Sequence, residues 1–173
     1  NYWQEGSLGV LGALAQHQEH LPENFIPNLL AVRQVIAPAY ARLAIEKDSE
    51  AIVRLLEKSN WLIDNPTEFA AYDWEVHHGL SIASGNPIYT LILNGFRELY
   101  QPMACQYFEL EHARRCSQDF YKKLLNAAWM HEPAAAEEYT RQAMEQSQEL
   151  WIEAIKNSNL QGKKSEYYSP GGA

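Results

Sequence analysis

Apolar residues recur along this chain mainly at helical spacing, three or four positions apart, and no stretch alternates apolar and polar residues as a half-buried strand does. Pro and Gly fall mostly between the periodic stretches. The pattern predicts an all-α fold, an antiparallel bundle of about seven helices with short connections. The predicted helices cover about residues 4–18, a stretch that starts near Asn24, a stretch after Asp48, 66–84, 87–108, 112–129 and 133–157.

Two Asn-Pro pairs predict where helices begin. Asn65 is a good N-cap residue, and Pro66 is tolerated at the first helical position because its missing N–H has no partner there. The same pair recurs at 86–87, directly after Gly85, which suits the end of the preceding helix. Pro102, inside the next apolar stretch, predicts a kink. Residues 83–88 therefore form a tight joint between two helices.

Charge and cysteine content narrow the function classes. The 173 residues suit one domain, and a net charge of −8 makes the surface a poor partner for DNA or an anionic membrane. Cys105 and Cys116 make no disulfide framework, and no stretch approaches the roughly 20 apolar residues of a membrane span, so a reduced, cytoplasmic setting is expected.

The two ends of the chain carry separate expectations. Because the first residue is Asn, we expect that an N-terminal part has been removed. Residues 158–173 are polar and Gly-rich, and we expect a disordered tail there.

One predicted helix face combines aromatic bodies with hydroxyl groups. Phe96, Tyr100, Met103 and Tyr107 follow one another at spacings of four, three and four, so they share a face. A tyrosine offers a flat apolar ring and a polar tip. The spacing alone is compatible with a core stripe and with the lining of a ligand slot.

A cation also stands on a mostly apolar face. Arg33 shares its face with Leu29, Ile36 and Tyr40. Such an arginine commonly lays its stem on the core and keeps its head in water. The alternative is that its planar guanidinium binds a phosphate or a carbonyl oxygen.

The last predicted helix carries a further mixed face. Met144, Ser147, Trp151 and Ile155 lie together on it, and Lys156 follows near its end. By pattern alone, the tryptophan belongs to the core and the lysine is a favourable charge at a helix C-terminus.

Asp73 and His77 are the candidates for a metal site. Their i, i+4 spacing on one helix can hold a divalent ion, and His78 or His112 would be available as further ligands. An Asp–His hydrogen bond is the simpler structural alternative. No Ser-centred elbow, Gly-rich phosphate loop or Cys–His signature is present, and we expect the protein not to be an enzyme.

Four stretches carry a resemblance to a known family. They are GNPIYTLILNGFRELY at 85–100, NLLAVR at 28–33, FYKKL at 120–124 and SQELW at 147–151. Together they resemble the C-terminal domain of FadR-type regulators of fatty-acid metabolism, in the GntR superfamily, over about residues 1–157. The order of Gly, Asn, Pro, Tyr, Asn-Gly and Leu-Tyr in the longest stretch is not dictated by helix formation, which makes it specific.

The resemblance implies a function. Regulators of this family pair a winged-helix DNA-binding domain, absent from this chain, with an all-helical effector and dimerisation domain, here residues 1–157. They are homodimers that repress fatty-acid degradation and activate unsaturated fatty-acid synthesis, and long-chain acyl-CoA releases them from DNA. The implied effector is therefore long-chain acyl-CoA, with no cofactor and no membrane partner.

The resemblance also implies the site. The positions that match acyl-CoA-site residues of the family are Arg33, Tyr100, Tyr107, Tyr121, Ser147, Trp151 and Lys156. One departure is Met144, which stands where FadR has a small Gly close to the pantetheine arm.

Two alternatives stay open. Wider relatives with this helical domain bind a divalent metal through an Asp and three histidines. Asp73 and His77 match the first two ligands, but Tyr121 and Met144 stand at the other two. A metal-dependent sensor of a small carboxylate is thus one alternative, and a purely structural dimerisation module is another.

Overall fold

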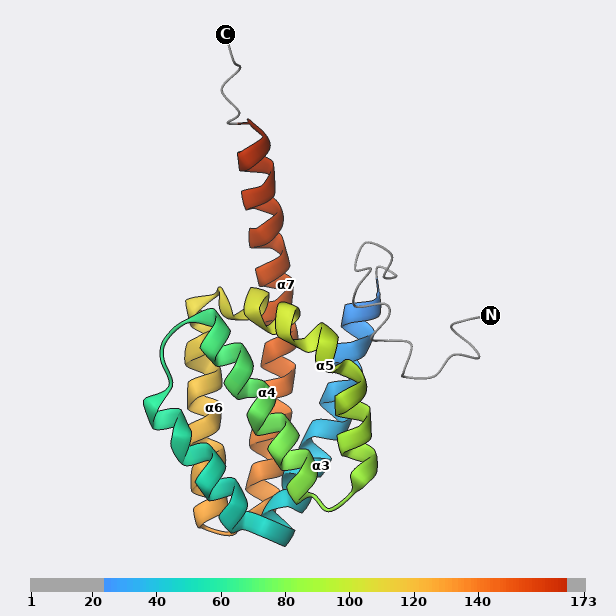
Figure 1. Cartoon of the computed structure of the whole chain (residues 1–173), viewed down its shortest axis with the longest axis vertical. Coiled ribbons are helices and arrows are strands. Elements are labelled where there is room, and N and C mark those ends of the chain that lie inside the picture. The colour runs from blue at the N-terminus through green and yellow to red at the C-terminus, as the bar shows by residue number, and fades with distance from the viewer. Residues whose placement is uncertain (1–23, 168–173) are drawn as a thin grey trace, which may run out of the picture.

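The structure, a computed structural model, describes the backbone of residues 24–167 and the side chains as far as Ile155. This part of the chain is all-α, as predicted, and contains no strand. Figure 1 shows the helices running up and down beside one another. The elements are α3 (Phe25–Glu57), the 3-10 helix η2 (Lys58–Trp61), α4 (Pro66–Ala83), α5 (Pro87–Phe108), α6 (Glu111–Trp129) and α7 (Pro133–Tyr167).

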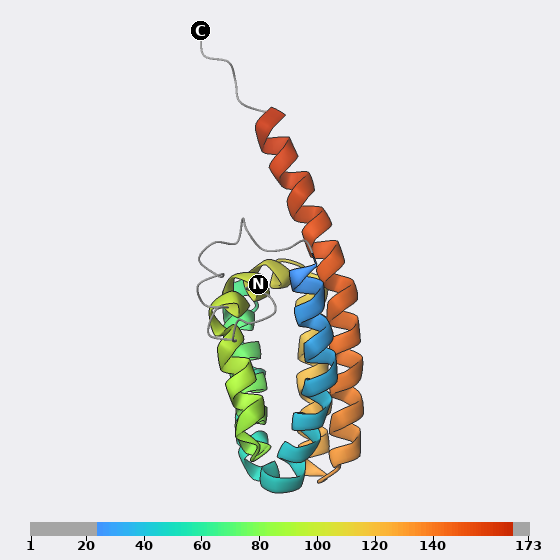
Figure 2. The same cartoon turned by 90° about the vertical axis from the view of Figure 1, so that its right-hand side faces the viewer.

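The bundle has two layers. Figure 2 shows α4 and α5 on one side and α3, α6 and α7 on the other. The core lies between the layers, where each helix places its apolar stripe against those of its neighbours. Among the largest fully buried side chains are Tyr40, Ile52, Leu56, Phe108 and Tyr121.

The predicted helix joints are confirmed. The Asn65 side chain accepts a hydrogen bond from the Glu68 N–H at 2.9 Å, and the Asn86 side chain accepts one from Ile88 at 3.1 Å. Gly85 has φ of +66°, a left-handed conformation that suits glycine because it has no Cβ. Local capping chemistry therefore sets both ends of the joint between α4 and α5.

The number of helices differs from the prediction of about seven. The predicted helix over residues 4–18 lies outside the described residues. The second and third predicted helices are joined end to end as α3, with a break at Asp48, whose φ of −150° and ψ of 60° are not helical. The Asp48 carboxylate caps the following turn by accepting from the Ala51 N–H at 3.1 Å. The predicted break is thus present, but without a connecting loop, and five α-helices are described.

Helix α7 runs past its predicted end near Asn157 and continues to Tyr167, into the segment expected to be disordered. Figures 1 and 2 show it projecting beyond the other helices. This stretch contains no Pro, and Lys, Gln and Leu are good helix formers, so its polar character does not end the helix. Pro102, where a kink is predicted, lies inside α5. Figure 1 shows α5 bending across the top of the bundle.

One apolar residue of α3 does not lie on its buried face. The spacing of three and four residues predicts that Val32 shares an apolar stripe with Leu29 and Ile36, but Val32 is 44% exposed, whereas Leu30, Ala37 and Ala41 are buried. The reason is that α3 packs against α4, α6 and α7, and these contacts, rather than hydrophobicity alone, choose its inward side.

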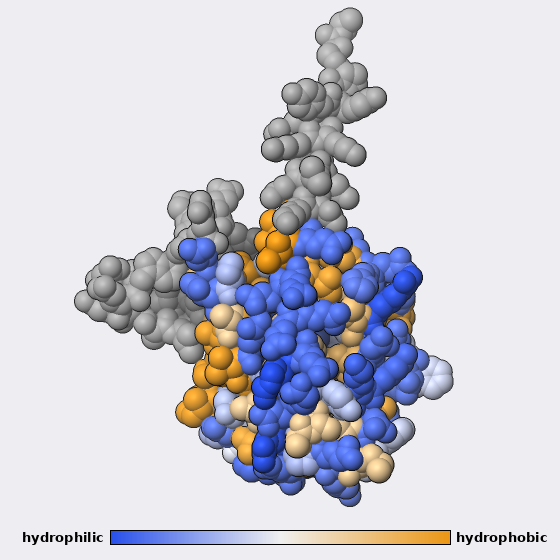
Figure 3. Space-filling model, turned by 180° about the vertical axis from the view of Figure 1, so that it is seen from behind, coloured by the Kyte–Doolittle hydropathy of each residue, from blue (hydrophilic) through white to orange (hydrophobic). Residues whose placement is uncertain are grey.

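The outer surface is mainly hydrophilic on one side of the bundle, as expected for a chain with a net charge of −8. Figure 3 shows the side formed by α3, α6 and α7 as mainly hydrophilic, with apolar residues in small groups. Among the described helices, none is long and apolar enough to cross a membrane.

Candidate functional site

All five α-helices contribute to one pocket between the two layers. Its walls are mainly apolar, with Leu, Ile, Phe and Met side chains the commonest, and it holds about 70 Å³ of space. Polar side chains are few and come from different helices: Arg33, Asp73, Tyr100, Tyr107, Ser117, Gln146 and Ser147. An apolar cavity with a few convergent polar groups is the usual form of a small-molecule site.

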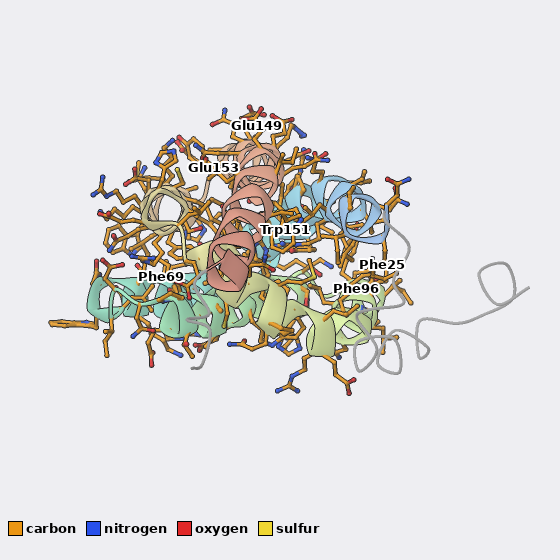
Figure 4. All side chains as sticks on the ribbon, turned by 90° about the horizontal axis from the view of Figure 1, so that it is seen from above. Phe25, Phe69, Phe96, Glu149, Trp151 and Glu153 are labelled. Carbon is orange, nitrogen blue, oxygen red and sulfur yellow. The ribbon has the colours of Figure 1, made fainter. Side chains whose placement is uncertain are left out.

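Most of the predicted ligand contacts meet at this pocket. The lining includes Arg33, Tyr100, Tyr107, Ser147 and Trp151. These residues come from α3, α5 and α7, so helices far apart in the sequence supply one site. Figure 4 shows Trp151 pointing inward from α7, whereas Glu149 and Glu153 lie on its outer side.

The remaining predicted residues are placed differently. Tyr121 is fully buried behind the lining and reaches the pocket through its hydrogen bond to Asp73. The side chain of Lys156 lies outside the described residues. Met144 lines the pocket and is buried, so it occupies space at the site where a glycine would leave room. The Ser147 hydroxyl donates to the Met144 carbonyl at 2.8 Å.

Asp73 is the centre of the polar network. One carboxylate oxygen accepts from the Tyr121 hydroxyl at 2.7 Å, and the other accepts from the Tyr100 hydroxyl. Because both oxygens are acceptors, the arrangement suits the ionised acid. The Arg33 guanidinium lies 3.9 Å from the second oxygen. One carboxylate on α4 therefore links side chains of α3, α5 and α6.

Arg33 is held by charge and by an aromatic face. Its guanidinium carbon lies 5.3 Å from the centre of the Tyr100 ring, a cation–π contact. Burial lowers the pKa of Arg33, but the nearby Tyr100 and Asp73 outweigh it, and the pKa is raised overall. The arginine keeps its charge at every physiological pH.

The two tyrosines remain hydrogen-bond donors. Burial is the main cause that raises the pKa of Tyr100 and of Tyr121 well above the ordinary value, and the negative charge of Asp73 adds to it. Both hydroxyls are protonated at neutral pH, and both donate to Asp73. They are occupied within the protein rather than directed at a ligand.

Two buried donors at the pocket lack a partner. The Nε of Arg33 and the Nε1 of Trp151 are buried without a hydrogen-bond acceptor among the described residues. Leaving a buried donor unsatisfied costs about 1–3 kcal/mol. A bound molecule with an acceptor oxygen at this place would remove that cost.

The spacing of Asp73 and His77 predicts an alternative metal site, but the structure places Asp73 in the same pocket as Tyr100 and Tyr107. His77 is fully buried, its Nδ1 is 2.8 Å from the Tyr40 hydroxyl, and its Nε2 is 3.9 Å from Asp73. No group of three metal-ligating side chains occurs among the described residues. At the position of a possible third ligand, Tyr121 instead donates a hydrogen bond to Asp73.

The contact between Asp73 and Tyr100 could not be predicted from their spacing in the sequence.

The buried His77 should make stability depend on pH. Burial lowers its pKa to about 4, and Arg33 adds to this while Asp73 opposes it. In the unfolded chain the His77 imidazole is protonated below its ordinary pKa of about 6.5. In the folded protein the same imidazole stays neutral until the pH reaches about 4. Stability contributed by neutral His77 is therefore present at pH 7 and is lost as the pH falls. The difference in unfolding free energy between the wild type and His77→Gln, measured in urea, should shrink by about 2–3 kcal/mol from pH 7 to 4.5. An unchanged difference would contradict the buried neutral state.

Comparisons with known proteins point in one direction. The family model described as the FadR C-terminal domain matches residues 1–161. A fatty acid metabolism regulator protein of Erwinia tasmaniensis is 34% identical over 151 residues, which cover 87% of this chain and 63% of that relative. One of Yersinia pestis and one of Yersinia pseudotuberculosis are each 40% identical over 124 residues, or 72% of this chain and 52% of the relative. The chain thus spans between about half and two thirds of the length of these curated relatives.

Proposed function

Because the chain belongs to the FadR C-terminal domain family, we propose that it is the effector domain of a regulator of fatty-acid metabolism and that its effector is long-chain acyl-CoA. The relatives are regulators by name, which fits a binding domain rather than an enzyme. In this proposal the domain works in a cytoplasmic homodimer. A winged-helix domain outside the chain contacts the DNA of genes for fatty-acid degradation and unsaturated fatty-acid synthesis.

The observation that carries the proposal is the composition of the pocket. An acyl chain needs an apolar slot, and its thioester and pantetheine arm need hydrogen-bond donors at one end. The walls are largely apolar, and the donors without a partner are the Nε of Arg33 and the Nε1 of Trp151. Tyr107 and Ser147 add polar groups to the lining. Lys156 is retained in the proposal as a partner for phosphate.

The size of the pocket supports a mechanism by linkage. Its space of about 70 Å³ is well below the roughly 300–1,000 Å³ of pockets that enclose a drug-sized ligand. A long acyl chain must therefore favour an arrangement in which the two layers stand further apart. A ligand that binds one arrangement better shifts the population toward it. In the full-length regulator, we propose that this shift releases the DNA-binding domains from their half-sites.

Calorimetric titration with tetradecanoyl-CoA tests the function. We expect saturable binding, with unacylated CoA binding far more weakly. Arg33→Gln should weaken binding roughly tenfold or more, because it removes a buried donor and the charge opposite Asp73.

Arg42→Gln is the matched control, since this arginine lies on the same helix but pairs with Glu46 and Glu137 at the surface. Its affinity should equal that of the wild type. Absence of binding to the wild type would refute the proposal, and equal loss in both variants would refute the role of Arg33.

A further inference from the structure

The charges of the pocket balance within the protein. Among the described residues that line it, Arg33 and Asp73 carry the charges, and their side chains are 3.9 Å apart. Both are largely buried, with 15% and 11% of their side-chain surfaces exposed, so solvent screens them little. The pocket is therefore close to neutral, although it contains a guanidinium.

Of the donors around Asp73 and Arg33, two are used within the protein and two lack an acceptor. The hydroxyls of Tyr100 and Tyr121 each donate a hydrogen bond to Asp73, so both carboxylate oxygens of Asp73 already have a donor. The Nε of Arg33 and the Nε1 of Trp151 have no acceptor. A ligand is thus offered N–H donors, but no net positive charge.

We propose that Asp73 is a specificity-determining residue, which makes the pocket accept an uncharged acceptor group and reject a carboxylate. This inference rests on the proposed function, because it names the ligand group that the same pocket recognises. A thioester carbonyl accepts a hydrogen bond from Arg33 or Trp151 without adding charge. The carboxylate of a free fatty acid brings a second anion beside Asp73, and the single guanidinium of Arg33 cannot compensate two buried anions.

The geometry explains why a carboxylate is needed opposite Arg33. Without Asp73, the guanidinium is an uncompensated cation in an apolar cavity, which is the usual setting for a carboxylate ligand. With Asp73 held by two tyrosines from α5 and α6, the cation is already neutralised. The side chain that distinguishes an activated acyl group from its free acid is then an acid on α4.

The test compares two probes that share one acyl chain and lack phosphate: S-tetradecanoyl-pantetheine and tetradecanoate, each below its aggregation concentration and near neutral pH. The wild-type chain should bind the thioester roughly tenfold or more tightly than the carboxylate. Asp73→Asn, which keeps an acceptor oxygen for the tyrosines, should reduce this preference by roughly tenfold or more because Arg33 then lacks its counter-charge. Asp119→Asn, an exposed acid on α6, is the matched control and should leave the preference unchanged.

A second variant keeps the test decisive if Asp73→Asn does not fold. Arg33→Gln leaves Asp73 as the one charge of the pocket, so it should weaken carboxylate binding more than thioester binding. Equal wild-type affinities for the two probes, or an unchanged preference in folded Asp73→Asn, would overturn the inference. Either result, obtained with a protein that binds tetradecanoyl-CoA, leaves the proposed function standing. Failure to bind tetradecanoyl-CoA overturns both.

Discussion

Lengthening the acyl chain of the CoA ester from eight to fourteen carbons is expected to tighten binding by up to roughly 5 kcal/mol, a few thousand-fold in Kd. Each methylene that moves from water into an apolar slot contributes about 0.8 kcal/mol. In the proposed function, the slot is the pocket between the two layers, whose walls are mainly apolar. Titration calorimetry with the eight-, ten-, twelve- and fourteen-carbon esters measures the slope. Because the helices must move apart to admit the chain, the measured gain in binding free energy should be smaller than this upper limit.

A pair of variants tests whether the acyl chain lies in this pocket. Ala104 lines the pocket, whereas Ala71 is exposed on α4. Ala104→Leu should reduce affinity for the fourteen-carbon ester more than for the eight-carbon ester, and Ala71→Leu should change neither. The same affinity at every chain length would exclude burial of the acyl chain.

Replacement of Asp73 by Ala is expected to lower the free energy of unfolding by about 3–5 kcal/mol. The substitution leaves the Arg33 guanidinium without its counter-charge and removes the acceptor of two buried tyrosine hydroxyls. A loss of this size is a large share of the roughly 5–15 kcal/mol that stabilises a typical domain. Urea unfolding followed by circular dichroism measures it.

Two further proteins separate the charge effect from simple loss of a side chain. Asp119→Ala removes an exposed acid and should change stability by no more than about 0.5 kcal/mol. The double variant Asp73→Ala with Arg33→Met should recover part of the loss, since it removes the unpaired cation as well. If Asp73→Ala costs no more than Asp119→Ala, the carboxylate does not hold the network together.

The sequence by itself determined the helical class and the joints between helices. The hydrogen bonds that start α4 and α5 link Asn65 and Asn86 to backbone groups two or three residues away, so capping rules suffice to find them. Gly85 ends α4 for a similarly local reason. The break at Asp48 was also readable, although the absence of a loop there was not.

The resemblance to a family supplied candidate residues, but not the contacts between them. It pointed to Tyr100 and Trp151, and both line the pocket. It left Asp73 in a separate, metal-binding interpretation, because the i, i+4 spacing to His77 is the local signal that a sequence displays. The aromatic stripe of α5 likewise could not be assigned to core or ligand from its spacing alone.

Only the tertiary structure decided what Asp73 does. Its hydrogen-bond partners Tyr100 and Tyr121 are 27 and 48 residues away along the chain, and Arg33 lies on a third helix. The packing of α3 against α4, α6 and α7 also determined that Val32 is exposed. Helix caps depend on neighbours in sequence, whereas the state of a buried charge depends on whichever groups the fold brings within a few ångströms.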